Sequence, residues 1–172
     1  MKSLIRSGAL ASALLLAACS GSTSSGTAES TKEFSAAQML AQVRAAGQIG
    51  NELDVQPLRD AQVEDLRAVA ALAENNGDIG AAQNALEQAL RMVPEDPDLL
   101  QWQAELALLG RDWEKAETLA MSSYQKGPKL GGLCRRSWAT IQFAREARGD
   151  AFNSLLAQQN IANCTVAPPV RM

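Results

Sequence analysis

The stretch that decides the fold runs from residue 76 to residue 94 and reads NGDIGAAQNALEQALRMVP. It opens with a turn signal, continues with strong helix formers and ends at a proline. Two of its landmarks return 34 residues later, Asp78 as Asp112 and Pro94 as Pro128. The other pairs at this spacing are Ala82 with Ala116 and Leu66 with Leu100. A single spacing shared by unlike residue types predicts an internal repeat built from one helix–turn–helix unit.

Helices are also predicted on the N-terminal side of this stretch. Ser35 suits the N-cap of a helix that runs to about Gln48, and Pro57 suits the first turn of a second helix that runs to about Asn75. Apolar side chains follow one face of the first helix at spacings of three and four, namely Met39, Leu40, Val43 and Ala46. No segment alternates with period two for long enough to make a strand. The sequence therefore predicts an all-α domain.

The repeat resembles the tetratricopeptide repeat, closely over residues 63–96 and 97–130 and less closely over 135–164. The run Asn76-Gly77-Asp78-Ile79 is similar to the tight turn of that family, and Pro94 matches the proline that ends the unit. Small residues stand where the two helices of a unit cross, namely Ala82, Ala89 and Ala116. The resemblance implies a short right-handed α-solenoid of about three hairpins plus the helix at 35–48. A generic helical bundle with accidental spacing is the alternative.

Two departures from the family pattern stand out. In the second copy the turn glycine, Gly110, comes one residue early. In the third copy, Trp138, Ile141, Gly149 and Asp150 match only after a displacement of four residues, and Ser154 and Gln158 replace the usual alanine and aromatic residue. The third unit is therefore expected to be a terminal, solvent-facing cap.

The N-terminal residues form a targeting segment. A basic start with Lys2 and Arg6 precedes an apolar run over residues 8–18, which is shorter than the roughly 20 residues of a membrane-spanning helix. The run ends in Leu16-Ala17-Ala18-Cys19, which resembles the lipobox of bacterial lipoproteins. That resemblance implies cleavage before Cys19 and attachment of acyl chains, palmitate among them, to this cysteine. An ordinary signal peptide with a chance cysteine is the alternative.

The lipobox also sets the predicted domain division. Residues 1–18 are the signal peptide, 19–34 the lipidated cysteine with a flexible Ser/Gly/Thr-rich tether, 35–164 the helical domain and 165–172 a C-terminal tail. By the enterobacterial sorting pattern, Ser20 after the lipidated cysteine implies the outer membrane, on its periplasmic side.

Composition narrows the classes of function. The 172 residues are 47% apolar, carry a formal charge of −3 and include no histidine. The lack of histidine excludes serine and cysteine hydrolases that use a histidine base, and it excludes zinc sites with histidine ligands. The net charge is negative, whereas a nucleic-acid-binding protein usually carries an excess of Lys and Arg. We therefore expect no enzyme activity, no cofactor, no metal, no nucleic acid and no small-molecule substrate.

Two cysteines remain once Cys19 is lipidated. Cys134 precedes the first helix of the third predicted hairpin and Cys164 follows the second, so an antiparallel hairpin would bring them together. An even pair of cysteines in an oxidising compartment predicts a structural disulfide. A redox-active pair is the alternative, although the spacing is not Cys-x-x-Cys.

In tetratricopeptide proteins the first helix of each unit lines a groove that binds peptides. The resemblance places these residues on the groove face: Arg67, Glu74, Gln101, Glu105, Leu108, Arg136 and Phe143. Such a face is mixed in charge, with an apolar strip near Leu108 and Phe143, and it has no cluster of Lys and Arg to clamp a carboxylate. The same side chains could instead be solvated or packed against neighbouring helices.

These expectations describe a membrane-tethered adaptor. The chain would bind protein or peptide partners in cell-envelope assembly, secretion, pilus or cell-wall machinery, and would contact the membrane through its lipid anchor. One alternative is a periplasmic chaperone-like holder of unfolded clients. Another is a permanent structural subunit of an envelope complex.

Overall fold

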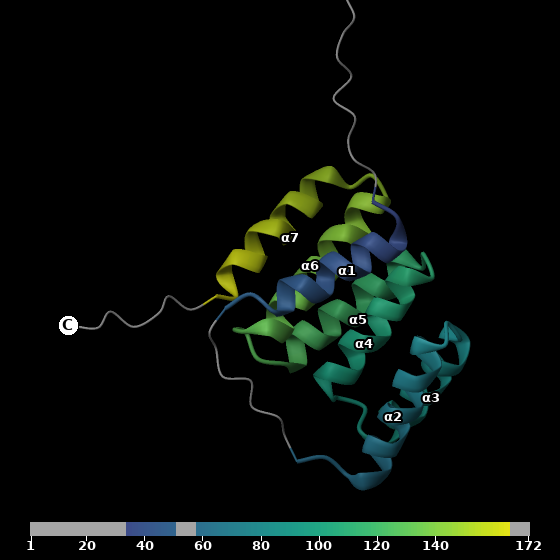
Figure 1. Cartoon of the computed structure of the whole chain (residues 1–172). Helices are drawn as coiled ribbons and strands as arrows, with labels where there is room; N and C mark the ends of the chain where they lie inside the picture. The colour runs from purple at the N-terminus through teal and green to yellow at the C-terminus, as the bar shows by residue number, and fades with distance from the viewer. Residues whose placement is uncertain (1–33, 51–57, 166–172) are drawn as a thin grey trace, which may run out of the picture. The chain divides into compact units, whose positions relative to one another are not determined.

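Seven α-helices account for the ordered elements of the computed structural model, which describes residues 34–50 and 58–165 (Figure 1). No strand occurs within these two ranges. The helices are α1 (Ala36–Gly47), α2 (Ala61–Asn75), α3 (Ile79–Met92), α4 (Pro97–Leu109), α5 (Trp113–Lys126), α6 (Gly132–Ala147) and α7 (Ala151–Asn163). The prediction of an all-α chain is confirmed. The predicted signal peptide and nearly all of the tether, including Cys19, lie outside the described residues.

Six of the helices make three consecutive hairpins, α2–α3, α4–α5 and α6–α7, whose partners pack closely along their length. The residues that permit this contact are small. Ala82 and Ala89 of α3 and Ala116 and Ala120 of α5 have no exposed surface. In α7 the corresponding inner face carries Ala157 and the small polar Ser154, both buried. The period of small residues in the sequence thus corresponds to the helix crossings.

Aspartate side chains begin most of these helices. A carboxylate at the N-cap accepts hydrogen bonds from backbone N–H groups that have no partner within the helix, and it complements the helix dipole. α1 begins instead at Ser35, which forms a reciprocal capping box with Gln38 as predicted. The aspartate caps are Asp60, Asp78, Asp96, Asp112 and Asp150. Because Asp60 supplies the cap, α2 begins at Ala61, later than predicted, and Pro57 lies outside the described residues.

The turns within the hairpins share one conformation. Gly77 and Gly149 have φ of 78° and 77°, a left-handed conformation that favours glycine. In the second hairpin the same position falls on Arg111, with φ of 62°, because Gly110 comes one residue too early to serve. The early position of Gly110 in the sequence therefore leaves a non-glycine residue in the left-handed conformation of this turn.

A disulfide closes the last hairpin. Cys134 and Cys164 are bonded, with their Cα atoms 5.7 Å apart, so the predicted pairing is confirmed. Cys134 lies inside the first turn of α6 and not ahead of it, because that helix already begins at Gly132. Both sulfur-bearing side chains are buried.

The helix predicted at 35–48 is present as α1, and the structure adds where it lies. α1 packs against α6 and α4, whereas among the described residues its backbone does not approach that of α2 (Figure 1). The segment between α1 and α2 is long enough to allow this, since α2 begins 14 residues after α1 ends. α1 therefore adds a helix to the face of the hairpins and not to their end.

Candidate functional site

α1 occupies the face on which the sequence predicted an open groove. That face is formed by α4 and α6, the first helices of the second and third hairpins. Met39 and Val43 of α1 share a buried cluster with Leu108 of α4 and Phe143 of α6. The ring of Phe34 meets that of Phe143 edge-on, with the centroids 5.9 Å apart. α1 of the same chain thus lies where a bound peptide was expected.

The backbones of α1 and α6 meet at two glycines. A Cβ atom added to Gly132 would lie only 2.6 Å from the carbonyl oxygen of Gly47. Next to this contact, Nε of Arg135 donates a hydrogen bond to the Ala46 carbonyl oxygen at 3.0 Å. Since Phe34 contacts Phe143 at the other end, α1 runs antiparallel to α6. The absence of side chains at both glycines is what permits the approach.

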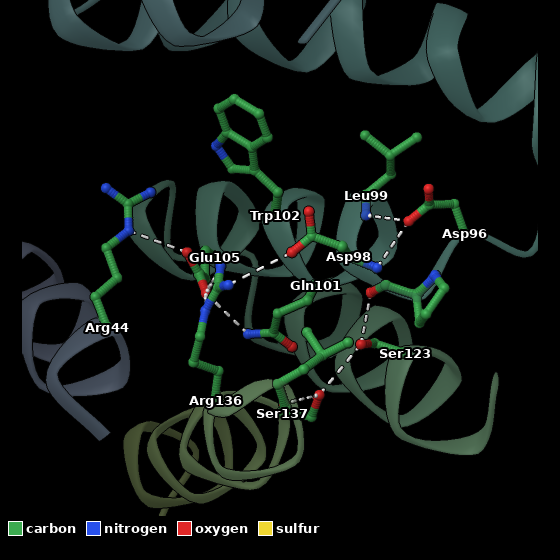
Figure 2. Close-up of polar contacts among 12 residues, drawn as sticks. Arg44, Asp96, Asp98, Leu99, Gln101, Trp102, Glu105, Ser123, Arg136 and Ser137 are labelled. Atoms are coloured by element: carbon green, nitrogen blue, oxygen red, sulfur yellow. Dashed lines mark hydrogen bonds and ion pairs between the residues drawn. The ribbon is translucent and has the colours of Figure 1, made fainter. Parts of the chain in front are cut away.

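A buried carboxylate joins three helices at the centre of this face (Figure 2). Glu105 of α4 has no exposed surface. Its two oxygens accept hydrogen bonds from Nε of Arg44 on α1 at 3.0 Å and from Nε of Arg136 on α6 at 2.8 Å. The amide of Gln101 donates to it at 3.1 Å. Burial lowers the pKa of Arg44, but Glu105 and Glu74 outweigh this and leave the pKa raised, so Arg44 remains a cation.

A second set of polar contacts joins α2 to α4. Arg67 pairs with Asp98 at 2.7 Å, and its guanidinium carbon lies 5.4 Å from the centroid of the Trp102 ring. Nε1 of Trp102 donates to Glu74 at 2.7 Å, and Glu74 also pairs with Arg44 at 2.7 Å. The first hairpin is therefore connected through charged groups to the same network that holds α1.

A cleft of about 320 Å³ remains beside the C-terminal end of α1, lined by Arg44, Gln48, Glu74, Trp102 and Arg136. Both of its arginines are already paired with carboxylates. The cleft is polar and balanced in charge, and it does not present the cationic surface that would clamp a free carboxylate.

Comparison with known proteins identifies a solved structure whose fold is similar to that of this chain. No family model and no curated protein matches the chain. A solved structure does. It is the globular C-terminal domain of LpoP from P. aeruginosa, with 29% sequence identity and a TM-score of 0.56. The match covers 61% of this chain and 99% of the LpoP domain, so the likeness takes in that whole domain.

The seven residues predicted to line the groove fall into two groups. Arg67, Glu74 and Arg136 keep partly exposed side chains at the α2–α4 contact and around the cleft. The other four are buried, so the prediction that they face an open groove is wrong: Gln101, Glu105, Leu108 and Phe143. Gln101 and Glu105 lie within the polar network, whereas Leu108 and Phe143 pack against the apolar side of α1.

Sequence reasoning missed Arg44 and Trp102, which connect α1 and α2 to the second hairpin. The signal for Arg44 was its isolation, because it is the sole charged residue within α1, next to the apolar Val43. A single charge beside the apolar side of a short helix is well placed to meet a buried counter-ion.

Two further predictions concern absent features. In the described parts of the chain, no cluster of three or more His, Cys, Asp or Glu residues could hold a metal ion. Over residues 34–50 and 58–165, no helix combines the length and the apolar character needed to cross a membrane. Whether Cys19 is lipidated stays a prediction, since this residue is outside the described part.

Proposed function

We propose that this chain is a lipid-anchored protein of the outer membrane, facing the periplasm, whose helical hairpins bind another protein of the cell envelope. The observation that carries the proposal is the likeness to the LpoP domain, which extends over 99% of that domain at 29% identity. In this proposal the hairpins are tetratricopeptide-like units, and the chain is a non-catalytic adaptor.

Two features of the chain support the proposed location. The Leu-Ala-Ala-Cys sequence at residues 16–19 provides a site for lipid attachment. The Cys134–Cys164 disulfide suits an oxidising compartment such as the periplasm. Several acyl chains on one cysteine would hold the protein stably, since each buried CH₂ contributes about 0.8 kcal/mol.

The likeness also suggests where to look for the partner. Relatives of whatever envelope protein binds the LpoP domain are the first candidate partners, and the cell-wall machinery named above is the first system to search. The holder of unfolded clients is the weaker alternative. Such a protein needs an accessible apolar groove, whereas α1 fills the part of the groove over α4 and α6.

The test is co-purification of the full-length, tagged chain from its own membrane after mild crosslinking. We expect one or two envelope proteins in fixed ratio. A broad mixture of unrelated proteins would indicate a holder, and a complex that survives high salt at a fixed ratio without crosslinking would indicate a permanent subunit.

A Cys19→Ser variant serves as the control for anchoring. It should lose incorporation of a clickable palmitate analogue and should leave the outer-membrane fraction, while its helical domain keeps the same circular dichroism spectrum. Retention of the label, or of the membrane location, would contradict the proposed anchor.

A further inference from the structure

The outer face of α7 carries an unusual set of side chains for the end of a row of hairpins. Phe152 is 72% exposed and Leu155 59% exposed, and Leu156 is also exposed. Spacings of three and four place them on one stripe, which continues to the exposed Gln159. α7 has no charged residue over Ala151–Asn163. A terminal unit normally presents a polar outer face, so this stripe lacks the expected cap character.

In α5, the second helix of the preceding hairpin, the positions that correspond to Phe152, Leu155 and Leu156 are polar. Asp112 and Asp150 both cap the second helix of a hairpin, and this register aligns Leu155 with Glu117 of α5. Glu117 is covered by α6, where it pairs with Arg145 at 2.7 Å. α5 thus meets the next hairpin through a charge, whereas α7 offers an apolar side chain at the equivalent place, and no hairpin follows it within the described residues.

α7 is held firmly against α6. Its first turn is fixed by Asp150, which accepts hydrogen bonds from Asn153, and Arg145 donates to the Asn153 carbonyl oxygen at 3.1 Å. Its other end is fixed by the disulfide at Cys164. A partner that binds the stripe therefore meets a preformed surface, which reduces the entropy lost on binding.

We infer that the α7 stripe, defined as Phe152, Leu155, Leu156 and Gln159, is a docking surface for an amphipathic helix of a partner protein. At Leu155 the partner helix would take the place that α6 takes beside Glu117 of α5, and its contact face would be apolar and uncharged. A charge buried there would find no counter-ion on α7 and would cost free energy of desolvation. This inference rests on the proposed function and specifies the surface that performs it.

A second copy of the chain fits this surface less well. The helix that would continue the row is α2, the first helix of the next copy. Its outer side carries exposed Val69 and Leu72, but also the exposed Asp65 one turn before Val69. Placing Asp65 against uncharged α7 would bury a carboxylate without a partner. The observations therefore favour a different protein.

The experiment compares two matched variants of the full-length, lipidated chain in its own membrane. Leu155→Glu places a charge in the stripe, and Leu72→Glu places the same charge on the exposed apolar side of α2, where Leu72 is 64% exposed. Both variants should keep the thermal midpoint of the parent within a few degrees. We expect Leu155→Glu to lower the co-purified partner at least tenfold and Leu72→Glu to leave it within twofold.

A photo-crosslinking residue in place of Gln159 identifies what covers the stripe. The expected product is one adduct with one envelope protein, and its crosslinked peptide lies in a helix with an uncharged apolar face. An adduct between two copies, with residues 166–172 of the same chain or with phospholipid overturns the inference, as does the absence of any adduct. Equal partner loss in the two glutamate variants also overturns it.

The same samples separate this inference from the proposed function. If the parent chain retains its partner and Leu155→Glu does so equally well, the adaptor role stands and the α7 surface is wrong. If the parent chain co-purifies with no envelope protein, the proposed function itself fails.

Discussion

Replacing Glu105 with glutamine removes the one negative charge that α1, α4 and α6 share. The carboxylate lies 3.0 Å from Nε of Arg44 and 2.7 Å from Nη2 of Arg136, and it has no exposed surface. In the variant, the amide NH₂ group would face the donors of both guanidinium groups and of Gln101. The hydrogen bonds that now connect the three helices would be lost or weakened.

The magnitude follows from burial. Removing one partner of a fully buried ion pair costs about 3–5 kcal/mol, because the remaining charge stays desolvated. Here the side chains of Arg44 and Arg136 are 42% and 24% exposed and can regain water. We therefore expect a loss of about 2–3 kcal/mol in the free energy of unfolding, which corresponds to about 8–10 °C in the thermal midpoint of a domain of this size.

The assay is urea-induced unfolding of the oxidised chain, followed by circular dichroism. Glu87→Gln is the matched control, because Glu87 is 47% exposed and pairs with Lys115 at 3.9 Å, an arrangement worth under about 1 kcal/mol. A double-mutant cycle with Arg44→Ala should give a coupling of about 1 kcal/mol or more. If Glu105→Gln costs no more than Glu87→Gln, the reasoning about this network is refuted.

Three further predictions test the rest of the domain. Replacing Cys134 and Cys164 together by serine should lower the free energy of unfolding by about 3–4 kcal/mol, because the disulfide closes a loop with a sequence separation of 30. Urea midpoints with and without reductant measure this loss, and a change under about 1 kcal/mol would contradict the prediction. Arg111→Gly should raise the stability by about 0.5–1 kcal/mol, because it relieves a left-handed residue; a lower thermal midpoint would count against the turn assignment. The hydrogen bonds from Asn153 hold the pKa of Asp150 below its ordinary 3.8, so its contribution to stability is complete above that pH and declines as the pH falls through the lower folded-state pKa. Asp150→Asn should therefore flatten the loss of stability as the pH falls below about 4, and an unchanged acid limb would contradict the assignment.

The hairpins could be predicted from the sequence because their determinants are local. The spacing of Asp78 and Asp112 marks two turns, at which the structure shows both residues capping the helix that follows, and the small Ala82 and Ala116 mark two crossings. The disulfide followed from the same reasoning, since an antiparallel hairpin places its two ends together. Each of these signals acts within a single hairpin of the chain.

Whether the groove is open or filled could not be predicted in the same way, because it depends on contacts between residues that are far apart in the sequence. The sequence shows that α1 has an apolar side with Met39 and Val43, but not which surface that side meets. The apolar strip at Leu108 and Phe143 matches α1, although the same strip suited a foreign peptide equally well. A glutamate within a helix is usually exposed to solvent, and the sequence gives no sign that Glu105 is different. Its complete burial is possible because two arginines from other helices pair with it.

The antiparallel contact of α1 with α6 also sets an order for assembly. Ala46 and Arg135, which share a hydrogen bond, lie 89 positions apart, whereas each hairpin joins neighbouring segments. Hairpins close quickly because little chain entropy is lost, and pairings between remote segments form later. During synthesis, the apolar side of α1 emerges before the hairpins and has nothing to cover it until the third hairpin has appeared. The earliest part of the domain to be made is therefore the last to be buried, and in the interval it is the segment most exposed to aggregation or to capture by a chaperone.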